Sequence, residues 1–324
     1  AFGERPADAL FDAPDERLEP TLGPVPPPPP PSPTLDATLP PTPRIAVEEL
    51  EAPGGPAAEV SSRIDTVAVV LADDPVMAEQ LAPLLDALQS HTTPIHVEGI
   101  VDEQWHPIHA SPRQSWRELR VGLQLASRSG PVGEDEIERF NAAIAEFAGA
   151  VGAVSQREAP AAAAARARDL DRFCADADIE VAVNVIGQFG ATFAVARVRS
   201  LALEHGMSET GAGDLVAFAA DGYPEFSIRR FDDARAKASG AYYTGITFAL
   251  DLPNAADPAS ALADMVAVAS SLAEKLGGQL VDDNRRPLTE AGLASIRRSL
   301  EKIVQDMEAH GIPAGSPLAR RLFA

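Results

Sequence analysis

The sequence predicts an α+β fold in which antiparallel sheets carry helices on one face, and three observations lead to it. Short apolar segments with a period of two alternate with longer segments whose apolar residues recur every three to four positions. The same order of elements runs twice along the chain. Apolar residues make up 45% of the 324 residues but aromatic residues only 5%, which indicates small, helix-rich cores.

The first segment, residues 1–62, is predicted to be a disordered, acidic, proline-rich linker. It contains the run Pro26–Pro31 and several later prolines. Proline removes backbone donors and favours the extended polyproline conformation. Acidic side chains without hydrophobic periodicity are typical of disorder. A ligand for an SH3-type domain is the alternative interpretation of this segment.

Residues 63–176 are expected to form a first α+β repeat. Its strands are β-branched or alternate apolar with polar residues, and its helices carry one apolar stripe. The expected strands are 64–71, 95–101 and 119–125. The expected helices begin at Pro75 and span 137–151 and 161–175.

Residues 178–312 are expected to form the second repeat. The expected strands are 179–186, 215–219, 225–231, 242–252 and 279–281. One helix is expected over 191–204, a second begins at the Asp257-Pro258 cap, and the last begins at Thr289. The tail 313–324 either folds back onto a domain or remains loose.

The two repeats share the order strand, helix, strands, strand, helix, helix. Gly122-Leu123-Gln124-Leu125 is matched to Gly245-Ile246-Thr247-Phe248, and Val151-Gly152-Ala153 to Leu276-Gly277-Gly278. A sheet with helices on one side leaves its other face to water or to a partner. We therefore expect function on that second face.

Composition excludes several classes of function. The formal net charge of −21 argues against a nucleic-acid partner, because phosphate binding needs clustered Lys and Arg. The single cysteine, Cys174, cannot form an internal disulfide and is expected to be a packed small residue in a reducing compartment. The chain contains no stretch of about 20 apolar residues, which is the length needed to span a membrane.

Motifs for catalysis are also missing from the sequence, so we expect no catalytic residue, no cofactor and no metal site. The chain has no G-x-S-x-G, Walker or CxxC motif. His106 and His109 are expected to be solvated loop residues rather than metal ligands. The Asp282-Asp283 pair is expected to form a structural turn, with acid–base work as the alternative.

Four segments of the second repeat resemble one known family. They are Leu276–Thr289 with its Gly pair, acidic pair and Arg pair, Val183-Asn184-Val185, Phe226-Ser227-Ile228, and Gly245-Ile246-Thr247-Phe248 closed by Pro253. Their order and spacing are similar to those of the C-terminal domain of the bacterial division proteins of the ZipA family. The resemblance covers about residues 178–310.

This resemblance implies a function. Members of that family join an N-terminal membrane helix and a proline-rich tether to a domain that binds the C-terminal tail peptide of FtsZ without catalysis. The implied location is the cytoplasmic face of the bacterial inner membrane. The chain begins at Ala1 rather than Met, so a membrane segment is expected upstream of Ala1.

The resemblance also implies the residues that line the peptide groove on the bare sheet face. They are Glu180, Ala182, Leu215, Arg229, Phe231, Thr247 and Ala249. The alternation of strand 179–186 agrees, because its apolar residues at odd positions are expected to face the helices.

Phe231 is expected to anchor the peptide. The groove is smaller and more polar than in the family, so Glu180 and Asp251 are expected to attract basic residues of the FtsZ tail. Two alternatives stay open. One is a soluble two-domain scaffold that binds another partner, and the other is an enzyme at the acidic turn or the histidine loop.

Overall fold

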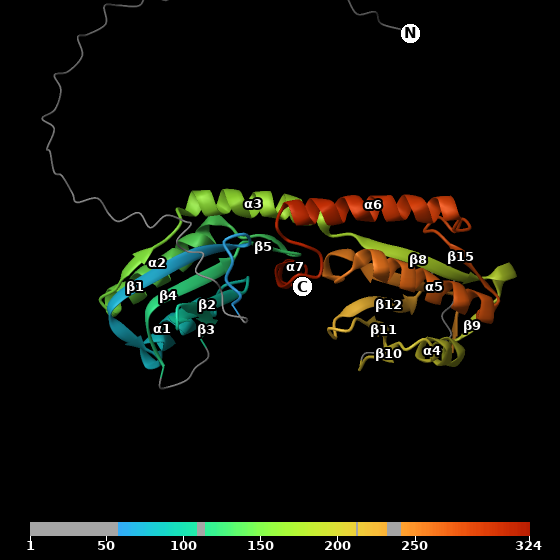
Figure 1. The fold of residues 1–324 in the computed structure, drawn as a ribbon, viewed down its shortest axis with the longest axis horizontal. Coiled ribbons are helices and arrows are strands. Elements are labelled where there is room, and N and C mark those ends of the chain that lie inside the picture. The colour runs from blue at the N-terminus through green and yellow to red at the C-terminus, as the bar shows by residue number, and fades with distance from the viewer. Residues whose placement is uncertain (1–57, 109–113, 212, 232–240) are drawn as a thin grey trace, which may run out of the picture. The chain divides into compact units, whose positions relative to one another are not determined.

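The computed structural model describes residues 58–108, 114–211, 213–231 and 241–324. The prediction of a disordered linker therefore lies, up to residue 57, outside the described residues. The described part contains two large antiparallel sheets, two small two-stranded sheets and helices, which confirms the α+β fold class (Figure 1). We call the part from β1 to β7 the N-terminal lobe and the part from β8 to α7 the C-terminal lobe.

The N-terminal lobe is built on a five-stranded sheet with the order β3-β2-β4-β1-β7. Its strands are β1 (Asp65–Met77), β2 (Ile95–Val101), β3 (Gln104–Pro107), β4 (Ser115–Gln124) and β7 (Val154–Gln156). Its helices are α1 (Ala78–Leu88) and α2 (Glu134–Ala150), and a small hairpin pairs β5 (Ala126–Ser127) with β6 (Gly130–Pro131). The apolar stripes of α1 and α2 pack with alternate residues of β1 and β4 into one core.

The C-terminal lobe is built on a six-stranded sheet with the order β10-β11-β12-β14-β8-β15. Its strands are β8 (Glu180–Gly187), β10 (Ser208–Glu209), β11 (Leu215–Phe218), β12 (Pro224–Arg230), β14 (Gly245–Asp251) and β15 (Gly278–Val281). Its helices are α4 (Val195–Glu204), α5 (Pro258–Leu276), α6 (Glu290–Ala309) and α7 (Pro317–Leu322). A separate pair joins β9 (Phe193–Ala194) to β13 (Tyr242–Tyr243), and short 3-10 turns span Gln188–Gly190 and Leu252–Asn254.

Helix α5 covers one face of this sheet and crosses its central strands (Figure 1). Val183 and Val185 of β8 and Phe248 of β14 point into the core beneath it, because alternate residues of a strand face the same side. Helix α6 lies beside the first half of β8, where β15 supplies no strand partner.

Local signals set two helix starts and two helix ends where the sequence predicts them. The Asp257 side chain accepts a hydrogen bond from the Ser260 backbone N–H at 3.0 Å, and Thr289 accepts one from Gly292 at 3.1 Å. Gly152 and Gly277 follow α2 and α5 with φ of 68° and 66°, a conformation that favours glycine. The two helix starts and the matched glycine ends are thereby confirmed.

The N-terminal lobe differs from the sequence prediction in the start of its first helix and in its short strands, since β3, β5, β6 and β7 are all absent from the prediction. The helix expected from Pro75 begins at Ala78, because β1 continues through Met77, which pairs with Ser115 after an irregularity. Strand β3 is absent from the prediction, since four residues ending in proline carry too little alternation to be recognised.

The order of elements is the same in both lobes, as the repeat predicts. The outer strands pair differently. In the first lobe, β2, the earlier strand of its hairpin, pairs with β4. In the second lobe, β12, the later strand of its hairpin, pairs with β14. When Gly152 is aligned with Gly277, Val69 of β1 becomes equivalent to Asn184 of β8. Their strand partners, Arg120 and Thr247, are then equivalent as well. Gly122 is then equivalent to Ala249, so the predicted match of Gly122 to Gly245 is wrong by four residues.

Helix α3 (Pro160–Ala177) contributes to both cores. Ala163 and Ala167 in its first half are buried in the N-terminal core. Phe173 and Cys174 in its second half are buried in the C-terminal core. One continuous helix thus ties the two lobes together.

A buried ion pair makes a second connection between the lobes. The Asp65 carboxylate is fully buried and lies 2.6 Å from Arg321 Nη2. Burial raises the pKa of Asp65, and the positive charge of Arg321 opposes that rise. Leu322 and Phe323 are fully buried in the C-terminal core, so the tail folds back onto the lobe.

We predict that Arg321→Met destabilises the protein by about 3–5 kcal/mol, because it leaves the buried Asp65 carboxylate without its cation. The free energy of unfolding in urea measures this. Arg172→Met is the matched control, since Arg172 pairs with Asp169 at the surface and its loss should cost less than about 1 kcal/mol.

The loss in free energy of unfolding caused by Arg321→Met should also depend on pH. The pKa of Asp65 is raised on folding, so its ionisation costs stability as the pH rises through the folded-state pKa. Without Arg321 this cost grows, and the deficit should shrink between about pH 7 and pH 4 as Asp65 becomes protonated. A deficit that stays constant over this range would assign the loss to packing instead.

Candidate functional site

The face of the C-terminal sheet turned away from α5, which we call the open face, carries most of the residues expected to bind a partner. The strand register places Thr247 opposite Asn184 and Arg229, and Ala249 opposite Ala182 and Ser227. Further along the same face, Asp251 lies opposite Glu180.

Leu215 does not belong to this face, and its expected position is wrong. It pairs with Ile228, whose side chain packs into the core beneath the helices, and Leu215 is buried there too. Val216 is the residue of β11 on the open face, opposite Ser227. A strand of four residues does not fix its own register, and a shift of one residue exchanges the two faces.

An ion pair crosses the middle of the open face. Arg229 donates to both carboxylate oxygens of Glu180, with Nη1–Oε2 at 3.0 Å and Nη2–Oε1 at 2.5 Å. Both side chains are about half exposed, at 52% and 46%. The pair spans strand β14, so a bound peptide must either pass over it or separate it.

The centre of the face is small and polar. The Thr247 hydroxyl donates to Asn184 Oδ1 at 2.7 Å, and Asn184 Nδ2 donates to Asp283 Oδ1 at 3.2 Å. Asn184 and Thr247 are buried, so these hydrogen bonds satisfy groups that would be costly to leave unpaired. They also connect the face to the turn that holds Asp282 and Asp283.

Phe231 follows β12 at one end of the open face and is half-buried. Its ring lies under the Arg285 guanidinium, 5.3 Å from ring centroid to Cζ. A Cβ atom at Gly245 would lie 3.1 Å from the Phe231 Cβ, so glycine gives the phenylalanine room beside the strand. By strand alternation from Arg229, Phe231 lies on the side of the open face, and its role as an anchor stays a prediction.

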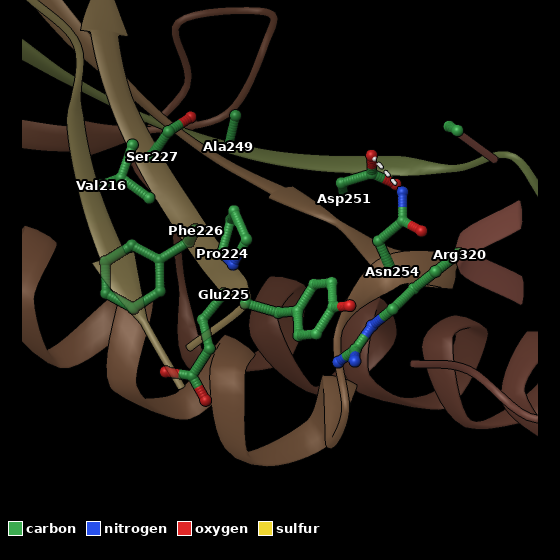
Figure 2. Close-up of a pocket in the computed structure, with 11 residues that line it drawn as sticks. Val216, Pro224, Glu225, Phe226, Ser227, Ala249, Asp251, Asn254 and Arg320 are labelled. Carbon is green, nitrogen blue, oxygen red and sulfur yellow. Dashed lines mark hydrogen bonds between the residues drawn. The ribbon is translucent and has the colours of Figure 1, made fainter. Parts of the chain in front are cut away.

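A hollow of about 320 Å³ opens at the other end of the face, and we call it the sheet hollow. Val216, Ser227 and Ala249 line it from three neighbouring strands, and Arg320 reaches it from the opposite side (Figure 2). The Arg320 guanidinium lies over the Tyr223 ring and donates to Asp221 at 2.7 Å. This hydrogen bond lowers the pKa of Asp221.

Asp251 closes the hollow on one side but is already engaged. It accepts hydrogen bonds from Asn254 at 3.0 Å and from Arg128 of the N-terminal lobe at 2.9 Å. Arg128 also bonds Asp178 at 2.8 Å, and these carboxylates raise its pKa. A basic peptide would therefore have to compete with Arg128 for Asp251 and with Arg229 for Glu180.

The alternative chemical sites have structural explanations. Burial raises the pKa of Cys174 to about 12, which keeps the thiol protonated and a poor nucleophile. Asp282 accepts from the Arg286 backbone N–H at 2.8 Å within its turn. His109 lies outside the described residues. Among the described residues, no three His, Cys, Asp or Glu side chains gather as a metal site would need.

No helix in the described part of the chain combines the length and the apolar character needed to cross a membrane.

Most of the C-terminal lobe matches the model of a known family. Residues 180–299 match the family model of the ZipA C-terminal, FtsZ-binding domain. The C-terminal lobe resembles ZipA. The match begins at the first strand of the open face and ends within α6, so it contains the open face of the ZipA-like lobe. A search of curated proteins gives no significant match to the chain.

We predict that Asn184→Ala costs about 1–3 kcal/mol, because Thr247 and Asp283 both lose a buried hydrogen-bond partner. Urea unfolding measures the loss. Ser227→Ala, at a half-buried position of the same face, should cost less than about 1 kcal/mol. Equal losses in the two variants would contradict a structural role of the Asn184 network.

Proposed function

We propose that the open face of the C-terminal lobe binds the C-terminal tail peptide of FtsZ. The description of the matching family supports FtsZ as the partner, since it names its members' domain as FtsZ-binding. The observation that carries the proposal is a sheet face left free by α5 within the matched residues, with a hollow at one end and Phe231 at the other. Such a face offers apolar contacts at its two ends, on either side of a polar centre, while the strands keep it rigid.

The proposed contact residues are Glu180, Ala182, Arg229, Phe231, Thr247 and Ala249, with Val216 in place of Leu215. Phe231 supplies the large apolar side chain typical of an energetic anchor. The small residues at the centre bury little apolar area, so affinity depends strongly on this anchor. The Arg229–Glu180 pair offers one charge of each sign to a peptide that carries both.

We extend the proposal to the whole chain. Residues 63–176 are a diverged copy of the same domain, residues 178–312 together with the docked tail form the binding domain, and no catalysis takes place. Binding ties the division ring to the cytoplasmic face of the inner membrane through a segment upstream of Ala1. The resemblance to ZipA and the proline-rich sequence of residues 1–62 support this arrangement.

We predict that Phe231→Ala weakens binding of the FtsZ tail peptide to the full chain by at least about tenfold, because truncating an anchor costs more than 1–2 kcal/mol. Isothermal titration with the synthetic peptide measures the dissociation constant. Leu203→Ala is the matched control, since Leu203 is an exposed apolar residue on α4, away from the open face.

Two results would contradict the proposal. Wild-type chain that shows no binding at tens of micromolar peptide would overturn FtsZ as the partner and favour a scaffold for another protein. Equal affinities of wild type and Phe231→Ala would instead overturn the open face as the binding surface.

A further inference from the structure

The sheet of the N-terminal lobe also has a face turned away from its helices, but this face is covered. Residues 58–62, which precede β1, lie across it. Val60 is 8% exposed and packs over Gly122 of β4, where a Cβ atom would lie 2.9 Å from Val60 Cγ1. Because Gly122 has no side chain, it leaves the space that the Val60 side chain occupies.

The covering segment is held mainly by one buried carboxylate. Glu98 of β2 is fully buried, and its Oε1 accepts the backbone N–H groups of Glu59 at 2.5 Å and of Val60 at 3.0 Å. Its Oε2 accepts from Arg120 Nε at 2.6 Å, and Arg120 lies over the Trp105 ring. Charge-assisted hydrogen bonds of this kind are about twice as strong as neutral ones.

Side chains fix the segment on either side of Glu98. The Glu59 carboxylate lies 2.5 Å from His96 Nδ1 on the same face. The Glu59 carbonyl accepts a hydrogen bond from Arg321 of α7. The segment thus contacts the sheet through its backbone, its apolar side chain and its charge.

This binding differs from ordinary strand pairing. An added strand at a sheet edge would exchange backbone hydrogen bonds with its neighbour. Here the segment crosses the face, and its two consecutive N–H groups go to a side chain. Arg120 satisfies one oxygen of the buried carboxylate, and the two amides of the docked segment satisfy the other.

The position of Val60 over Gly122 is informative, because Gly122 is equivalent to Ala249 of the second lobe and Arg120 is equivalent to Thr247. Ala249 lines the sheet hollow of the C-terminal lobe. Val60 therefore fills, in the first lobe, the place that is hollow in the second.

We propose that the outer face of the N-terminal lobe is a second peptide-binding site, occupied in cis by residues 58–62 of this chain. Its ligand is a peptide segment that donates two consecutive backbone N–H groups to Glu98 Oε1 and places a branched apolar side chain over Gly122. This inference stands without the proposed function, since no contact in it involves the C-terminal open face.

Binding in trans tests the proposal directly. A variant lacking residues 1–60 should bind a fluorescent peptide with the sequence of residues 54–62, measured by anisotropy, whereas the full chain should not because its own segment competes. A peptide with Val60→Asp should bind the truncated variant at least about tenfold more weakly. A folded truncated variant that binds neither peptide, or both equally, would overturn the site.

A second measurement uses the full chain and does not need the truncated variant to fold. Hydrogen exchange of the Glu59 and Val60 amides should be slow in the wild type, and Glu98→Gln should accelerate it at least about tenfold while β1 stays protected. Glu118→Gln, at an exposed position of β4, is the control and should leave both amides slow. Unprotected Glu59 and Val60 amides in the wild type would contradict occupation of the site.

Discussion

The buried ion pair between Asp65 and Arg321 is the interaction on which the rest of the fold depends. Asp65 opens β1 and is fully buried, so its charge requires a cation in a fixed place. Arg321 supplies it from α7, which therefore has to dock. Docking buries Phe323 in the C-terminal core and brings Arg320 to the rim of the sheet hollow. One electrostatic requirement in the first lobe thus shapes the site in the second.

The two lobes show how one scheme of strands and helices gives two different faces. In the C-terminal lobe, Thr247 and Asn184 satisfy each other, and the small side chains leave a hollow beside them. In the N-terminal lobe the equivalent strand carries Arg120, whose partner Glu98 still has an oxygen that needs donors. The choice of residues at the centre of the sheet, rather than the topology, decides which face is covered.

The sequence predicts features that depend on neighbours along the chain. Asp257 and Thr289 cap helices within three residues, and the alternation of strand β8 is long enough to assign its faces. Leu215 was placed on the wrong face because β11 is too short to fix its register. Contacts between distant segments left no local signal, as the separation of 256 positions between Asp65 and Arg321 illustrates. The docking of the segment around Val60 and the ion pairs of Arg128 also depend on contacts between distant segments.

The docked segment also determines how a mechanical load would enter the molecule. Residue 58 is where the chain leading from residues 1–57 meets the described fold, so a pull on that chain acts first on Glu59 and Val60. Their N–H groups are held by Glu98 of one lobe, and the Glu59 carbonyl by Arg321 of the other. Tension is therefore divided between both lobes before it reaches β1.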